Sequence, residues 1–167
     1  MTNLQILVSQ HQAKAAQMAS QSVVWSKRKE KWLRVLEQLN EQIRASLIGA
    51  GVSVEQIETT RHRITEETLG TYDAPGLQAK IGTATVQFVP IASVIIGGYG
   101  RVDVVGPRGE VKLIADDVGQ FYDPEIQTPS HERDWVWSAY PDKSRQSGFR
   151  LNDESLAKVL ELVLGNA

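Results

Sequence analysis

The chain has 167 residues, of which 41% are hydrophobic, and a formal net charge of −2, values ordinary for a water-soluble protein. It contains no cysteine, which excludes disulfides, thiolate metal sites and cysteine nucleophiles and is typical of a cytoplasmic protein. Its wholly apolar stretches are too short to cross a membrane, so we expect no membrane partner.

The charge is distributed unevenly along the chain. Residues 1–50 hold seven Lys or Arg against three acids, a balance of +4, whereas residues 51–167 hold eleven against seventeen, a balance of −6. Such an asymmetry indicates either a basic arm for an acidic partner or an arm that packs on its own acidic domain.

The first predicted element is a helix over residues 3–48. Good helix formers dominate it, neither Gly nor Pro occurs before Gly49, and Gly49 and Gly51 supply a stop. Large side chains recur at alternating steps of four and three, which places them on one side of the helix and favours packing against another helix. We call this stripe the seam; its members are Leu4, Val8, His11, Ala15, Met18, Ser22, Trp25, Lys29, Trp32, Leu36, Leu39 and Ile43.

The length of this helix predicts that it outgrows the domain that follows. About 46 helical residues make a rod of about 70 Å, whereas a domain of the remaining size is about 30–35 Å across. We therefore expect the seam to need a partner, with the interface at Trp25, Trp32, Leu36, Leu39 and Ile43. A helical hairpin, broken near Ser20–Ser22 where small polar and β-branched residues lower helix propensity, is the alternative to one continuous helix.

Beyond Gly51 the pattern becomes strand-like. Residues 58–65 predict an exposed edge strand, and residues 71–76 a turn because they contain Pro75-Gly76. Alternating apolar residues predict an antiparallel pair of strands at 77–81 and 84–88. Residues 94–96 predict a short buried run, followed by a glycine-rich bend.

The clearest local prediction is a β-hairpin over residues 101–113. Pro107 and Gly109 fit the second and fourth positions of a tight turn. With that turn, Val102 lies opposite Leu113 and Val104 opposite Val111, so four apolar side chains share one face of the hairpin.

The remaining segments complete an α+β fold. Residues 116–134 predict an acidic surface loop, residues 135–140 a strand, and Asn152 the cap of a closing helix. The prediction is thus a long N-terminal helix, an antiparallel sheet of five to six strands, and a C-terminal helix packed on the sheet. The predicted domains are a helical arm at 1–50 and a sheet domain at 51–167.

The hairpin also holds the best candidate for catalysis. Asp103, followed by Glu110-Val111-Lys112, resembles the acid and Glu-x-Lys arrangement of PD-(D/E)xK nucleases. In that family two acids hold a divalent metal and the lysine positions or activates the attacking water, so the resemblance implies these roles for Asp103, Glu110 and Lys112. Val102 stands where the family has Pro. The alternative is an exposed sheet face with an Asp103–Lys112 ion pair.

A basic stretch at residues 27–34 mixes cations with tryptophans, as nucleic-acid-binding surfaces do. Trp25 and Trp32 also lie seven residues apart in the seam, where helix packing would use them. The sequence favours a non-enzymatic interaction module that self-associates through its N-terminal helix, without cofactor or metal. A divalent-metal nuclease and a nucleic-acid-binding module remain the alternatives.

Overall fold

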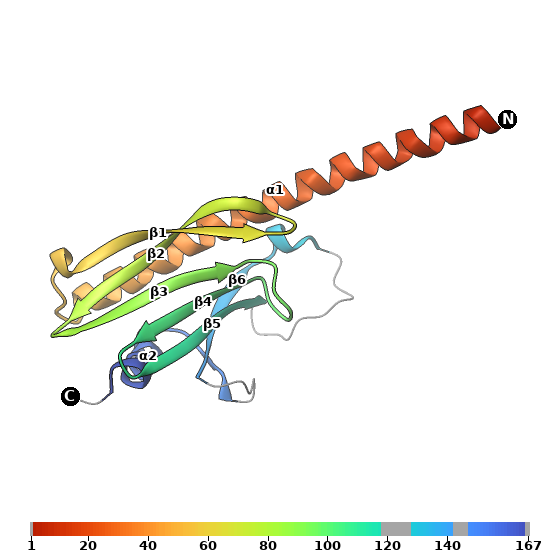
Figure 1. The fold of residues 1–167 in the computed structure, drawn as a ribbon. Helices are drawn as coiled ribbons and strands as arrows, with labels where there is room; N and C mark the ends of the chain where they lie inside the picture. The colour runs from red at the N-terminus through yellow and green to blue at the C-terminus, as the bar shows by residue number, and fades with distance from the viewer. Residues whose placement is uncertain (1, 118–127, 142–146, 166–167) are drawn as a thin grey trace.

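A long helix lies along a twisted sheet and runs on past its end, and a second helix lies near the C-terminus (Figure 1). The computed structural model describes residues 2–117, 128–141 and 147–165. The order of elements is helix, sheet and helix, which confirms the predicted α+β fold. No helix within the described ranges is long and apolar enough to cross a membrane.

Helix α1 (Asn3–Gly49) is continuous, so the helical hairpin is not formed. Its N-terminus has a capping box. The Thr2 hydroxyl accepts a hydrogen bond from the Gln5 backbone N–H at 3.2 Å, and the Gln5 side chain accepts one from the Thr2 N–H at 2.8 Å. The chain leaves the helix through Gly51, whose φ of +107° is accessible to glycine without strain.

Within the described residues the sheet contains seven antiparallel strands, and each pairs with its neighbour in the sequence. Short 3-10 helices, η1 (Val54–Gln56) and η2 (Ser130–Glu132), precede the first and the sixth strand. The strand count exceeds the predicted five to six. The strands are β1 (Ile57–Glu66), β2 (Gly70–Ile81), β3 (Ala84–Ala92), β4 (Gly100–Gly106), β5 (Gly109–Asp117), β6 (Trp135–Tyr140) and β7 (Phe149–Arg150).

Two predictions about the connections were wrong. The predicted turn at residues 71–76 lies inside β2, and the chain reverses at residues 67–69 instead. Gly76 serves a close approach rather than a turn, because a Cβ there would lie 2.7 Å from the Phe88 carbonyl oxygen. The predicted buried run at 94–96 belongs to the β3–β4 connection, where Val94 is 41% and Ile96 99% exposed.

The predicted hairpin is confirmed with its register, since Val102 pairs with Leu113 and Val104 with Val111. The strand pair at 77–81 and 84–88 is confirmed in β2 and β3. Of the predicted acidic loop, the first two residues complete β5, and residues 118–127 lie outside the described residues.

One hydrophobic core joins both helices to the same face of the sheet. Helix α2 (Asp153–Leu164), capped by Asn152 as predicted, contributes Leu156, Val159 and Val163. Helix α1 contributes only its C-terminal half. The core therefore continues across residue 50, where the sequence predicted a domain boundary. The α1 residues in it are Trp32, Val35, Leu36, Leu39, Ile43 and Leu47.

Candidate functional site

The resemblance to a nuclease centre is weakened by an arginine on the same strand. Asp103 and Lys112 are opposite each other in the β4–β5 register, and Glu110 lies opposite Val105. Both carboxylate oxygens of Asp103, however, accept hydrogen bonds from Arg101: Nε donates at 2.7 Å and Nη2 at 2.9 Å. The register is as predicted, but Asp103 forms its ion pair with Arg101 and not with Lys112.

This bidentate pair explains why Asp103 tolerates its nearly buried position. The hydrogen bonds to Asp103 raise the pKa of Arg101, so the guanidinium is fixed in its charged form. A divalent cation bound at the same oxygens would face that positive charge. Within the described ranges, no three His, Asp or Glu side chains cluster to hold a metal. The geometry favours a structural role for Asp103.

The predicted interface residues divide between the core and the surface. Trp32, Leu36, Leu39 and Ile43 are at most 2% exposed, because the sheet and α2 of the same chain cover them. Trp25 is half-buried at the edge of the core. These four buried residues are therefore not available to a second molecule, which corrects where on the helix an interface can form.

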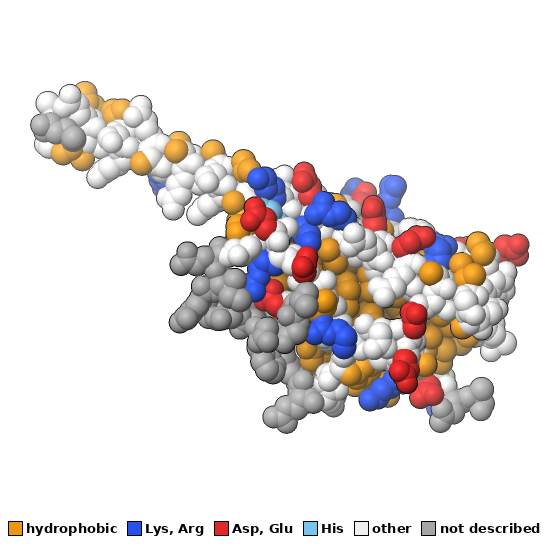
Figure 2. All heavy atoms as spheres, turned by 180° about the vertical axis from the view of Figure 1, so that it is seen from behind, with side chains coloured by type: hydrophobic (Ala, Val, Ile, Leu, Met, Phe, Trp, Pro, Cys, Tyr) orange, Lys and Arg blue, Asp and Glu red, His pale blue; other side chains and the backbone are white. Residues whose placement is uncertain are grey.

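The N-terminal half of α1, residues 3–26, which we call the arm, is uncovered except at Trp25. Every residue from Asn3 to Val24 is exposed, and the arm projects beyond the sheet (Figure 1). Residues 3–26 contain one charged residue, Lys14, and no acid. In Figure 2 the arm is mainly orange and white, while blue and red gather on the sheet domain. Its large exposed apolar side chains are Leu4, Ile6, Leu7, Val8, Met18, Val23 and Val24.

A groove of about 490 Å³ lies where the arm joins the domain, and we call it the base groove. The turn between β1 and β2 contributes Thr68 and Leu69 to its wall. The helix contributes Met18, Gln21, Ser22, Trp25, Ser26 and Lys29. Four of these six residues belong to the seam, so the seam runs from the core into the groove and from there onto the arm.

Arg28 anchors the helix just beyond this groove. It is only 8% exposed and lies between the β3–β4 connection and η2. Its Nε donates to Ser93 Oγ at 3.0 Å, its Nη1 to Ser130 Oγ at 2.8 Å, and its Nη2 to the carbonyl oxygens of Ser93 at 3.0 Å and Tyr99 at 3.3 Å. Two segments that are distant in the sequence, the β3–β4 connection and η2, thus fix one turn of α1.

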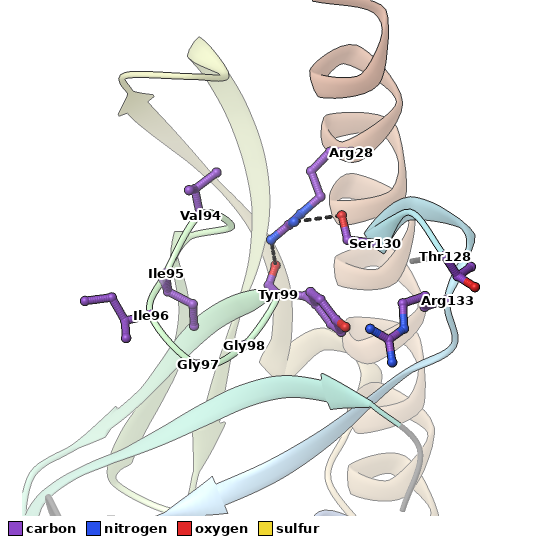
Figure 3. A pocket seen from close by; sticks show the side chains of 10 residues that line it. All are labelled: Arg28, Val94, Ile95, Ile96, Gly97, Gly98, Tyr99, Thr128, Ser130 and Arg133. Carbon is purple, nitrogen blue, oxygen red and sulfur yellow. Dashed lines mark hydrogen bonds between the residues drawn. The ribbon is translucent and has the colours of Figure 1, made fainter. Parts of the chain in front are cut away.

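Aromatic rings and the ion pair between Arg133 and Asp117 extend this anchor. Tyr99 stacks on Trp135 with 5.1 Å between ring centroids, and the Arg28 guanidinium lies 5.4 Å from the Tyr99 ring. The Tyr99 hydroxyl donates to Asp117, whose Oδ2 accepts from Arg133 at 2.8 Å. A cavity of about 420 Å³ opens beside Arg28, Tyr99 and Arg133 (Figure 3). Because protein oxygens bind both arginines, this cluster acts as a clamp on α1.

The predicted nucleic-acid surface at residues 27–34 is only partly exposed, because some of its side chains pack in the clamp. Arg28 is buried, and the Lys31 ammonium lies 5.8 Å from the centroid of Trp135. Lys29 lines the base groove. Sequence reasoning missed the clamp, because the serines that bind Arg28 lie 65 and 102 residues away along the chain.

A second missed network ties the seam to the β1–β2 hairpin. Trp32 Nε1 donates to the Tyr72 hydroxyl at 3.1 Å, and that hydroxyl donates to Glu66 Oε2. Glu66 also accepts the backbone N–H groups of Ser93, at 3.1 Å and 3.2 Å, and of Val94, at 2.8 Å. Burial raises the pKa of Tyr72, and the hydrogen bond to Glu66 raises it further.

Comparison with known proteins gives no relative from which a function could be inferred. No protein-family model, no curated protein and no solved structure matches the chain. The functional interpretation therefore rests on the arm, the base groove and the clamp.

Proposed function

We propose that the chain is a non-enzymatic assembly module that self-associates through the arm. The arm carries apolar side chains along about 36 Å of helix. Burying one such side chain is worth about 1.5–3 kcal/mol, so leaving several in water strongly favours association. A helix of this length without packing is only marginally stable in water, and a second helix would supply the missing contacts.

The observation that carries the proposal is the continuity of the seam. One regular spacing of side chains packs on the sheet from Trp32 to Ile43 and continues uncovered to Leu4. The clamp at Arg28 holds the helix where it leaves the domain, so the exposed part is presented in a fixed direction. A rigidly presented apolar face loses less conformational entropy on binding than a flexible one.

The test is the molar mass of the full chain in solution by light scattering. We expect a mass that is a multiple of 18.5 kDa at micromolar concentration, and a return to 18.5 kDa when Val8→Glu and Met18→Glu are combined. Both positions are exposed in the chain, at 46% and 60%, so the substitutions leave the core intact. Charged side chains in a helix–helix interface would be desolvated without a partner.

The matched control places the same two charges on the opposite side of the same helix, as Ala13→Glu with Ser20→Glu. Helical spacing puts these two exposed positions away from the seam, so this variant is expected to associate like the wild type. A wild-type chain that stays at 18.5 kDa would refute the proposal. Substitutions at Trp32 or Leu36 are unsuitable, because both side chains are buried and their loss would destabilise the core.

A further inference from the structure

The base groove has the lining of a site for one more helix. Its six residues from α1 are consecutive members of the face that a two-helix coiled coil uses: four from the seam, flanked by Gln21 on one side and Ser26 on the other. Thr68 and Leu69 supply the part of the lining that comes from the sheet domain. A helix lying in it would continue the layer that the sheet forms against the rest of α1.

The occupant has to suit a surface with little charge, because Lys29 is the one charged residue among those that line the groove. Lys14 is the only charged residue in the arm, so electrostatic attraction offers little selectivity for an acidic or a basic partner. Two copies of the arm would not repel each other strongly. The arm itself is a helix with one charged residue and an apolar stripe, and it is long enough to lie along the groove of a second molecule.

We infer that two chains pair their arms antiparallel, so that the tip of each arm occupies the base groove of the other. This inference rests on the proposed self-association and specifies its geometry. In a two-fold arrangement each contact occurs twice. Antiparallel alignment of the seams sets Val8 against Trp25 and Ala15 against Met18, one small and one large apolar residue in each case.

The same alignment also matches the polar positions of the seam. His11 lies against Ser22, so the two polar side chains face each other rather than an apolar residue. Leu4 lies against the aliphatic stem of Lys29 at the inner end of the groove. The four seam residues that line the groove thus receive the four seam residues nearest the tip, over about 39 Å of shared helix.

The antiparallel alignment that is displaced by seven residues toward the tips of the arms is poorer. It would place His11 against Ala15 and leave Trp25 beyond the start of the partner's α1. A buried histidine against a methyl group loses its hydrogen-bonding partner, and an uncovered Trp25 leaves the largest side chain of the groove in water. Polar residues within an apolar seam fix the register of helix pairs in this way.

The absence of cysteine from the chain permits a direct test by disulfide cross-linking of the full protein. The double variant His11→Cys/Ser22→Cys places the two thiols of one chain about 17 Å apart, too far to react with each other. In the antiparallel pair each thiol meets its counterpart on the other chain. We expect oxidation to convert this variant from 18.5 kDa to a covalent dimer on a non-reducing gel.

The single variants His11→Cys and Ser22→Cys decide the direction of the helices. Antiparallel pairing keeps identical positions about 17 Å apart, so neither single variant should cross-link. In the double variant Ala13→Cys/Ser20→Cys the two positions also lie level with each other across the antiparallel pair, but they face away from the seam, so this variant should stay uncross-linked too. This combination of results supports the inference.

Three results would overturn the inference, and light scattering distinguishes them from failure of the proposed function. Cross-linking of the single variants would show a parallel pair, and cross-linking of the Ala13/Ser20 control would show a different face. If all variants associate but none cross-links, the arms pair in another register, and self-association still stands. If no variant associates, the proposed function fails together with the inference.

Discussion

The two halves of α1 share one periodic seam and one helix but have opposite surroundings. From Trp32 to Ile43 the seam consists of large apolar side chains, and the sheet covers them almost completely. From Leu4 to Ser22 it includes His11, Ala15 and Ser22, and every residue is exposed. The comparison teaches that regular spacing places side chains on one face of a helix, whereas the size of these side chains and the neighbouring elements decide what covers that face.

Charge separates the two halves as clearly as size does. The arm has Lys14 alone, whereas the rest of α1 carries six Lys or Arg and all three acids of the first fifty residues. The covered half therefore keeps a solvated outer side, as a surface helix of a domain does. The arm lacks such a charged side, which suits a helix that is packed within an assembly.

The largest expected effect comes from cutting the seam inside the core. Trp32→Ala removes a fully buried ring whose centroid lies 6.2 Å from that of Trp137, and we expect a loss of about 3–5 kcal/mol in the free energy of unfolding. Met18→Ala, on the same seam but 60% exposed, should change it by about 0.5 kcal/mol or less. Urea unfolding of dilute protein measures both. Similar losses for the two variants would mean that the arm is also packed within its own domain.

The clamp is expected to contribute less than the core. Arg28→Met removes the hydrogen bonds to Ser93, Ser130 and Tyr99, and it should lower the free energy of unfolding by about 1.5–3 kcal/mol. Lys27→Met, one residue earlier and exposed, serves as the control and should change it by about 0.5 kcal/mol or less. Equal effects on stability in urea would contradict the clamp.

The smallest effect is a pH dependence where the seam meets Tyr72. Burial raises the pKa of Tyr72 in the folded protein, so above about pH 10 the unfolded chain loses this proton while the folded chain keeps it. The free energy of unfolding should be independent of this group below that pH and then fall by up to about 1.4 kcal/mol per pH unit. Tyr72→Phe should show a shallower fall in urea unfolding at alkaline pH. An identical slope in both proteins would exclude Tyr72 as the cause.

Local patterns in the sequence predicted the helices and strands well, but they predicted less well which residues other elements would bury. The register of the β4–β5 hairpin followed from Pro107, Gly109 and the alternation of valines, because turn chemistry and pairing act over a few residues. The continuous helix followed from the absence of Gly and Pro. The run at 94–96 was misread, because three apolar residues carry no signal for whether another element reaches them.

The site was less predictable than the fold, since its contacts join distant segments. Nothing near Arg28 in the sequence indicates that Ser93 and Ser130 supply its acceptors. The predicted interface at Trp32 and Leu36 could be corrected only once it was known that the sheet of the same chain covers these residues. For Asp103 a usable signal did exist: Arg101 stands two residues away on a predicted strand, so the two side chains share one face and can form an ion pair.

The central claim is that the chain's own domain covers one half of the seam and a second chain covers the other. Amide hydrogen exchange of the two halves of α1, measured at two protein concentrations, tests it most directly. Amides of residues 28–47 should be protected equally at both, because the same chain covers them. Amides of residues 5–24 should exchange quickly in dilute protein and become protected as concentration rises, because an unpaired helix of this length frays. Fast exchange of the arm at both concentrations would contradict the claim.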